Sequence, residues 1–256
     1  MTSMDMTFSC VYDGGRSVKG AGRGGEGGAL VPLARRFFRM RGFDHTNPED
    51  AAMSTGPTVD FWQERYRNQQ LGWDRGDASP QLRAWLEHEH LQAPARIAVP
   101  GCGTGWEVME LARQGFQVTG IDYTEAAVLH VRERLVAEQL QAEVVQADVL
   151  SWQPAEKFDA IYEQTCLCAL HPDHWVAYAA QLHRWLKPGG RLFALFMQSL
   201  KPEAAEGFIQ GPPYHCDIHA MRALFDASRW EWEKPPYPQV AHPNRMFELA
   251  VCLVAK

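Results

Sequence analysis

From residue 96 to the C-terminus, short apolar runs alternate with longer segments in which apolar residues recur every three or four positions. Short apolar runs are typical of buried strands, and the three-to-four spacing is typical of amphipathic helices. The pattern predicts strands over 96–100, 116–121, 142–147, 158–163, 191–197, 229–233 and 246–255. It predicts helices over 105–114, 124–140, 172–186 and 218–225. Because the strands alternate with helices, we expect an α/β fold built on a single doubly wound, mostly parallel sheet of seven strands.

Two further helices are expected ahead of the sheet, where they would form an N-terminal helical cap. The first covers residues 59–67 and the second starts at Pro80, directly after Ser79. Proline suits the first turn of a helix. Thr124 is expected to cap the helix over 124–140, because a hydroxyl side chain can accept a free N–H group at a helix start.

Two of the predicted helices differ in the strength of their apolar stripes. The helix over 172–186 carries a strong stripe, whereas the helix over 124–140 carries a rougher one through Leu129, Arg132, Val136 and Leu140. The segment Lys187-Pro188-Gly189-Gly190 is expected to end the longer stripe, since glycine favours a left-handed helix stop and proline prevents continuation.

A glycine-rich turn is the strongest chemical signal in the pattern. Gly101-Cys102-Gly103-Thr104-Gly105 follows the first predicted strand of the sheet, and Asp122 ends the next one. Glycines let a backbone bend sharply and approach a ligand closely. A carboxylate at the end of the second strand is placed to accept hydrogen bonds from a ribose diol. The combination indicates an enzyme that binds a nucleotide-like cofactor.

The spacing of the glycines discriminates among such cofactors. The turn has glycines at 101, 103 and 105 rather than the G-x-G-x-x-G of dinucleotide folds, which disfavours NAD. No G-K-[ST] follows it, which excludes a Walker-type phosphate loop. Asp148, at the end of the third predicted strand, could accept a hydrogen bond from an adenine amino group. The long loop over 202–214 and the segment 163–170 are expected to form the walls of the site.

These motifs, in this order, resemble those of class I S-adenosylmethionine-dependent methyltransferases over residues 58–256. Three further segments, Phe61-Trp62-Gln63-Glu64-Arg65-Tyr66, Gly72-Trp73-Asp74 and Gly211-Pro212-Pro213-Tyr214, are similar to the thiopurine S-methyltransferase-like superfamily. Within that superfamily the chain looks closest to the halide and thiol methyltransferase branch. Two positions depart from the family pattern: Tyr66 stands where tryptophan is usual, and Gln164 stands where the branch has tyrosine or the thiopurine enzymes have arginine.

The resemblance implies a set of site residues. The residues expected to bind S-adenosylmethionine are Trp62, Tyr66, Trp73, Gly101, Gly103, Asp122, Tyr123, Asp148, Val149 and Gln164. Tyr214 is expected on the acceptor side, as the catalytic candidate. Methyl transfer from a sulfonium is an in-line displacement, for which the protein mainly aligns the reactants and excludes water. Aromatic ring faces favour the cationic sulfonium.

The predicted activity is methyl transfer to a small soft nucleophile, foremost a thiol or sulfide sulfur. A halide or thiocyanate acceptor is the nearest alternative, and a thiopurine-type aromatic thiol is a more distant one. A non-catalytic module that binds the cofactor and regulates a partner belongs to a different class, which the complete set of cofactor motifs disfavours. An RNA methyltransferase is disfavoured by the acidic charge of the chain.

Composition limits the partners further. The chain has 256 residues, is 46% hydrophobic and carries a formal net charge of −6, which suits one globular domain and not a broad contact with nucleic acid. No apolar run approaches the roughly 18 residues that span a bilayer. We therefore expect a cytoplasmic enzyme that acts on a small-molecule acceptor, as a monomer or weak dimer, with no nucleic-acid or membrane partner.

Cysteine and histidine residues are the candidate metal ligands of this chain. The sequence has six cysteines at irregular spacing and no recognisable secretory signal, so reduced thiols are expected. Cys166, Cys168, His171 and His174 are all residue types that bind zinc. However, a single residue separates the two cysteines, which is closer than structural zinc sites use, so we expect no metal.

The first 53 residues differ from the remainder. Residues 14–28 contain eight glycines, which cannot form a packed core. We expect residues 1–53 to be a disordered Gly/Arg-rich extension and the methyltransferase domain to occupy 54–256. The preferred interpretation of the extension is that the native protein starts at Met53.

Overall fold

The computed structural model describes residues 56–88, 90–201 and 209–256. The described residues all belong to one compact unit, Thr46–Lys256. The expected extension over residues 1–53 and the centre of the loop over 202–214 lie outside the described residues.

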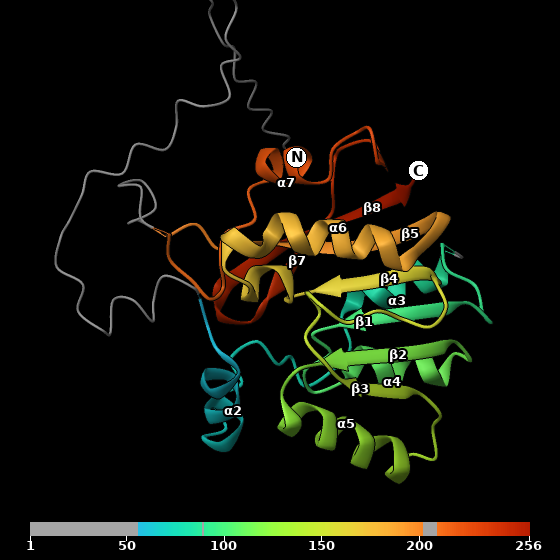
Figure 1. The fold of residues 1–256 in the computed structure, drawn as a ribbon, viewed down its shortest axis with the longest axis vertical. Coiled ribbons are helices and arrows are strands. Elements are labelled where there is room, and N and C mark those ends of the chain that lie inside the picture. The colour runs from blue at the N-terminus through green and yellow to red at the C-terminus, as the bar shows by residue number, and fades with distance from the viewer. Residues whose placement is uncertain (1–55, 89, 202–208) are drawn as a thin grey trace, which may run out of the picture. The chain divides into compact units, whose positions relative to one another are not determined.

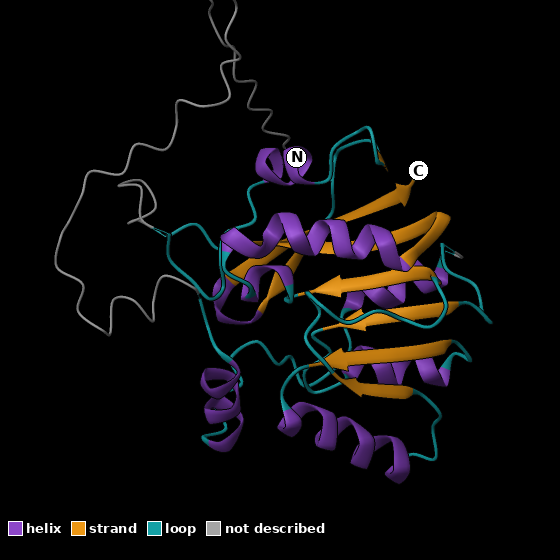
Figure 2. Cartoon of the chain, viewed as in Figure 1, coloured by secondary structure: helices purple, strands orange, loops and turns teal. Residues whose placement is uncertain are grey.

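One mixed sheet forms the centre of this unit (Figures 1 and 2). Its strands are β1 (Arg96–Pro100), β2 (Gln117–Asp122), β3 (Glu143–Gln146), β4 (Phe158–Gln164), β5 (Leu186–Gln198), β6 (Trp230–Trp232), β7 (Gln239–His242) and β8 (Met246–Ala255). The order is β3-β2-β1-β4-β5-β8-β6, with β7 also beside β8. Strands β1 to β5 are parallel, and β8 is antiparallel to its neighbours. The strand order reverses between β1 and β4, the place where such sheets bind ligands.

The structure contains one strand more than the sequence pattern predicted. Strand β7 was missed because it has four residues with little apolar alternation. Strand β5 pairs along nearly all of one edge of β8, so β6 and β7 share the other edge. β6 pairs with the end of β8 and β7 with its start, so together they fill a single position in the sheet. The expected doubly wound fold is therefore confirmed, with its seventh position divided between two short strands.

Helices cover both faces of the sheet (Figure 2). They are α2 (Val59–Arg67), α3 (Pro80–Glu87), α4 (Trp106–Arg113), α5 (Glu125–Ala137), α6 (Trp175–Trp185) and α7 (Ile218–Leu224). Residues of α3, α4 and α5 belong to one hydrophobic cluster, and residues of α6 and α7 belong to the other. The predicted cap at Thr124 is confirmed, since its hydroxyl accepts the Ala127 N–H. The Ser79 hydroxyl caps α3 in the same way by accepting the Gln81 N–H.

Two local predictions were wrong. In α5, Leu129 and Val136 are 49% and 79% exposed, while Val128, Val131 and Leu135 are buried. The buried stripe is thus displaced by one position. Which of two adjacent apolar residues is buried depends on how the helix packs against the sheet. The segment over 187–190 does not end a helix. It forms part of β5, as an irregularity between the pairs Phe158–Leu186 and Ala160–Arg191.

Candidate cofactor and acceptor site

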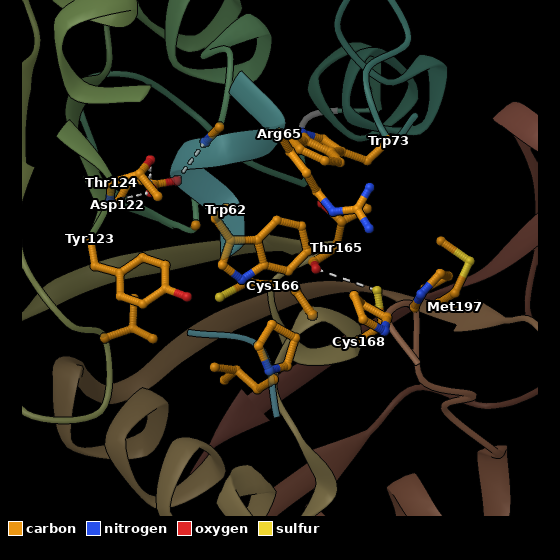
Figure 3. A pocket seen from close by; sticks show the side chains of 18 of the residues that line it. Trp62, Arg65, Trp73, Asp122, Tyr123, Thr124, Thr165, Cys166, Cys168 and Met197 are labelled. Atoms are coloured by element: carbon orange, nitrogen blue, oxygen red, sulfur yellow. Dashed lines mark hydrogen bonds between the residues drawn. The ribbon is translucent and has the colours of Figure 1, made fainter. Parts of the chain in front are cut away.

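A cavity of about 480 Å³ opens where β1 to β5 end (Figure 3). Its lining combines the glycine-rich turn after β1 with the carboxyl end of β2 and the turns after β3 and β4. Residues of α2, which lies far away in sequence, also line it, as do Met197 near the end of β5 and Met246 at the start of β8. The fold therefore brings the two halves of the chain together at the point where the strand order reverses.

The glycine turn is packed so tightly that side chains are excluded from it. Gly101, Gly103 and Gly105 have φ values of +58°, +55° and +77°, which L side chains rarely adopt. A Cβ atom on Gly101 would lie 2.9 Å from the Sγ of Cys166, and one on Gly105 would lie 2.6 Å from a methyl group of Val131. The backbone of the turn consequently forms the wall of the cavity itself.

Asp122 connects this turn to the end of β2. Its Oδ2 accepts a hydrogen bond from the Gly103 N–H at 3.1 Å, and its Oδ1 accepts from the Thr124 N–H at 2.9 Å and the Thr124 hydroxyl at 2.8 Å. Burial raises the pKa of the carboxyl group, and these three hydrogen bonds oppose that effect. The carboxylate is thereby held rigidly at the cavity wall, where it can accept hydrogen bonds from a diol.

The turn after β3 is ordered by Asp148. The Asp148 Oδ1 accepts the Leu150 N–H at 2.9 Å, and its carbonyl oxygen accepts the N–H groups of Ser151 and Trp152. Val149 is buried in the same turn. Tyr123, which directly follows the neighbouring strand β2, also lines the cavity. An apolar and aromatic slot with a carboxylate beside it suits a planar heterocycle that carries an amino group.

Three aromatic rings from the N-terminal segment cover the glycine turn. Trp62 and Trp73 meet edge to face with centroids 5.3 Å apart, and Tyr66 meets Trp73 at 5.9 Å. Burial raises the pKa of Tyr66, and the nearby Asp122 adds to this effect. Such rings favour a cation placed at their faces by about 0.5–2 kcal/mol each.

Arg65 is a lining residue that the sequence analysis did not single out. Figure 3 shows its side chain pointing into the cavity beside Trp62 and Trp73. Its guanidinium carbon lies 4.2 Å from the ring centroid of Phe61. Helical spacing could have predicted its position. Residues three apart lie on the same face of a helix, and Arg65 follows Trp62 by three.

The other end of the cavity combines sulfur-bearing and apolar side chains with three imidazoles. It is lined by Thr165, Cys168, His171, His174, Met197, Pro212, Pro213, His242 and Met246. Burial lowers the pKa of His242 to about 4, so this ring is neutral at pH 7. Its Nδ1 lies 3.2 Å from the carbonyl oxygen of Pro243. Soft, weakly polar surroundings of this kind suit a polarisable acceptor.

Gln164 and Tyr214 do not line this cavity. Gln164 donates a hydrogen bond to Glu248 at 2.8 Å and lines a smaller adjoining pocket of about 40 Å³, together with Gly101 and Trp73. Tyr214 is 6% exposed, donates its N–H to the Cys168 carbonyl oxygen at 2.7 Å, and packs edge-on against His171 at 5.5 Å. The other predicted site residues all line the large cavity.

The described residues contain no group of three or more His, Cys, Asp or Glu side chains arranged to hold a metal ion, although Cys166, Cys168, His171 and His174 all line the cavity. None of the described helices is long and apolar enough to cross a membrane.

Comparison with known proteins places this geometry in a family. The sequence profile of the family described as thiopurine S-methyltransferase matches residues 57–253, which is most of the chain. The chain belongs to the thiopurine S-methyltransferase family. It is therefore an S-adenosylmethionine-dependent methyltransferase, as the glycine turn and its neighbouring motifs predicted.

Individual relatives agree with this assignment. The chain is 31% identical over 181 residues to thiocyanate methyltransferase 1 of Arabidopsis thaliana, covering 69% of this chain and 77% of that protein. It is 30% identical to thiopurine S-methyltransferase of Legionella pneumophila strain Paris, covering 60% and 74%. The crystal structure of Burkholderia thailandensis 1,6-didemethyltoxoflavin-N1-methyltransferase with bound S-adenosylhomocysteine shares the fold, with a TM-score of 0.63 at 19% identity over 85% of this chain and 93% of that one.

Proposed function

We propose that this methyltransferase methylates the sulfur of a small thiol or sulfide. The observation that carries the proposal is the composition of the acceptor end of the cavity. The described residues there include the sulfur-bearing side chains Cys168, Met197 and Met246 and no carboxylate. The imidazoles of His171 and His174 lie at this end as well. A hydroxyl acceptor would have to lose a far less acidic proton, whereas a small thiol, with a pKa of about 8.5, is partly ionised near pH 7.

The cofactor residues are assigned by their positions in the cavity. Bound S-adenosylmethionine supplies a methyl group on a cationic sulfur. In this proposal the backbone at Gly101 and Gly103 contacts the methionine part, and Asp122 accepts from the ribose hydroxyls. Tyr123, Asp148 and Val149 form the adenine slot. The three aromatic residues of the N-terminal segment, Trp62, Tyr66 and Trp73, cover the sulfonium and exclude water.

In this proposal Gln164 and Tyr214 do not touch the ligands but position groups that do. Gln164 and Arg75 both donate to Glu248 Oε2, at 2.8 and 3.0 Å, and this network supports the glycine turn from the smaller pocket. Tyr214 holds His171 against the acceptor end and keeps the adjoining Pro212 and Pro213 in the cavity wall. Both residues thus position groups that touch the ligands.

Thiocyanate and halide ions form a second candidate class. The similarity to thiocyanate methyltransferase 1 favours it, and these ions are soft anions like a thiolate. We further propose that the enzyme acts on small molecules in the cytoplasm, as a monomer or weak dimer. The net charge of −6 argues against a nucleic-acid substrate.

An acceptor panel tests the proposed function. Purified protein is incubated with S-adenosylmethionine and sulfide, small thiols, thiocyanate, iodide or an aromatic thiol, and S-adenosylhomocysteine formation is measured. We expect the highest kcat/KM with sulfide or a small thiol. The Asp122→Ala variant serves as the matched control, because it should lose at least about tenfold in cofactor affinity with its charge-assisted hydrogen bonds. Turnover with none of the sulfur acceptors would contradict the proposal.

A further inference from the structure

The charges around the cavity are distributed unequally. Asp122 and Asp148 lie at the cofactor end, where both accept backbone N–H groups. Among the described lining residues, Arg65 is the one side chain with a permanent positive charge. His242 is neutral at pH 7 because burial lowers its pKa to about 4. A single fixed cation therefore faces a cavity whose acceptor end carries no negative charge of its own.

Within the part of the chain that the structure describes, no ion pair accounts for the charge of Arg65. Its Nε is buried without a hydrogen-bond partner, and its guanidinium lies over the ring of Phe61. Arg75, by contrast, is paired with Glu248 at 3.0 Å. Leaving a buried donor unpaired costs about 1–3 kcal/mol, and more for a charged group. Such a cost is common where a ligand completes the hydrogen bonds.

We propose that Arg65 is the anion-binding residue of the acceptor site and selects an acceptor that carries its negative charge on the nucleophilic atom. This inference rests on the proposed function. The planar guanidinium presents several N–H donors and is less strongly hydrated than an ammonium group, so it can pair with a soft anion inside a partly apolar cavity. The ring of Phe61 fixes its orientation.

The role follows from the charge balance of the reaction. A lone pair of the sulfur anion forms the bond to the methyl carbon, the bond from that carbon to the sulfonium breaks, and its electron pair remains on the departing thioether. Both products are neutral, and no proton has to be removed. Arg65 would hold a thiol as its thiolate by favouring the charged form. After transfer the methylated product lacks the charge that Arg65 bound, which assists its release.

This charge balance predicts how Arg65 affects the kinetics. The negative charge of the acceptor decreases as the new bond forms, so Arg65 binds the ground state at least as tightly as the transition state. With thiocyanate, which stays ionised at every working pH, removing Arg65 should raise the acceptor KM while leaving kcat nearly unchanged. A residue that merely supported α2 would instead impair cofactor binding, because Trp62 and Tyr66 lie on the same helix.

The experiment measures anion binding separately from turnover. Thiocyanate is titrated into the complex of the full chain with S-adenosylhomocysteine at fixed ionic strength, by calorimetry. The variants are Arg65→Met, which keeps the apolar stem, and Arg65→Lys, which keeps the charge. The control is Arg67→Met, an exposed residue of the same helix that does not line the cavity.

We expect Arg65→Met to raise the thiocyanate Kd and the acceptor KM by about 10- to 100-fold, the range for a charge-assisted hydrogen bond. The S-adenosylhomocysteine Kd should change by less than about twofold, Arg65→Lys should recover part of the loss, and Arg67→Met should match the wild type. The inference is overturned if wild type binds no thiocyanate, if Arg65→Met binds it equally well, or if thiocyanate and cofactor affinities fall together. If Arg65 binds thiocyanate but no acceptor is turned over, the proposed function fails and the anion site remains.

Discussion

At the scale of single residues, the carboxyl group of Glu163 shows how burial controls ionisation. Glu163 is 2% exposed, and its Oε1 accepts the Leu167 N–H at 2.7 Å. Burial, with a smaller contribution from the charge of Glu248, raises its pKa to about 8. The folded protein therefore binds a proton at Glu163 that the unfolded chain, with a glutamate pKa near 4.3, releases at much lower pH.

This raised pKa predicts a loss of stability as pH increases. The contribution of Glu163 is fully present below its unfolded pKa and declines by about 1.4 kcal/mol per pH unit up to the folded pKa near 8. Urea unfolding of wild type and Glu163→Gln should therefore diverge by roughly 2 kcal/mol between pH 6 and pH 8, with the wild type losing more. Glu156→Gln, which changes an exposed carboxylate, is the control. Parallel stability curves for wild type and Glu163→Gln would show that Glu163 is ionised throughout.

At the scale of elements, α2 is folded but weakly packed. The helix has no buried residue, although its aromatic side chains Trp62 and Tyr66 line the cavity. Its fixed contacts include the Thr58 cap and a hydrogen bond from the Ala126 N–H to Gln63 at 3.2 Å. Few buried contacts mean a small free energy of local opening. A bound cofactor would supply the apolar surface that α2 lacks.

Limited proteolysis tests this coupling between α2 and the cofactor. Trypsin cleavage after the exposed Arg67 should slow in the presence of S-adenosylhomocysteine, by up to about 100-fold at 100 times Kd, because the ligand binds only the closed helix. Mass spectrometry follows the fragment that ends at residue 67. The Asp122→Ala variant should show little protection at the same ligand concentration. Equal cleavage rates with and without ligand in the wild type would mean that α2 closes independently of the cofactor.

The helices and strands also differ in how well the sequence predicted them. The strand–turn–helix motif around Gly101, the helix start at Pro80 and the cap at Thr124 depend on neighbouring residues, so local reasoning placed them correctly. The buried face of α5 and the short β7 depend on partners distant in sequence. β7 exists because β8 offers it a free edge, and its four residues carry no strong strand pattern of their own.

At the scale of the whole molecule, one end of the cavity could be predicted from the sequence and the other could not. The cofactor end was predictable because Gly101, Asp122 and Asp148 follow successive strands of one parallel sheet, whose carboxyl ends meet. The acceptor end was not, because Arg65, Met197 and His242 come from three elements that meet only in the folded chain. Gln164 carries no charge, and the arginine that lines the cavity, Arg65, comes from α2.

Every lining residue that the structure describes lies between Pro57 and Met246, and the family match covers residues 57–253. A chain that starts at residue 54 should therefore fold and bind S-adenosylhomocysteine like the full chain. We expect its Kd to stay within about twofold and its Tm within about 3 °C, since 1 kcal/mol corresponds to roughly 2–4 °C at this size. Calorimetry and thermal unfolding of both chains measure this directly. A tenfold weaker affinity would instead assign residues 1–53 a part in the site, and the domain boundary proposed from the glycine-rich composition would have to move toward the N-terminus.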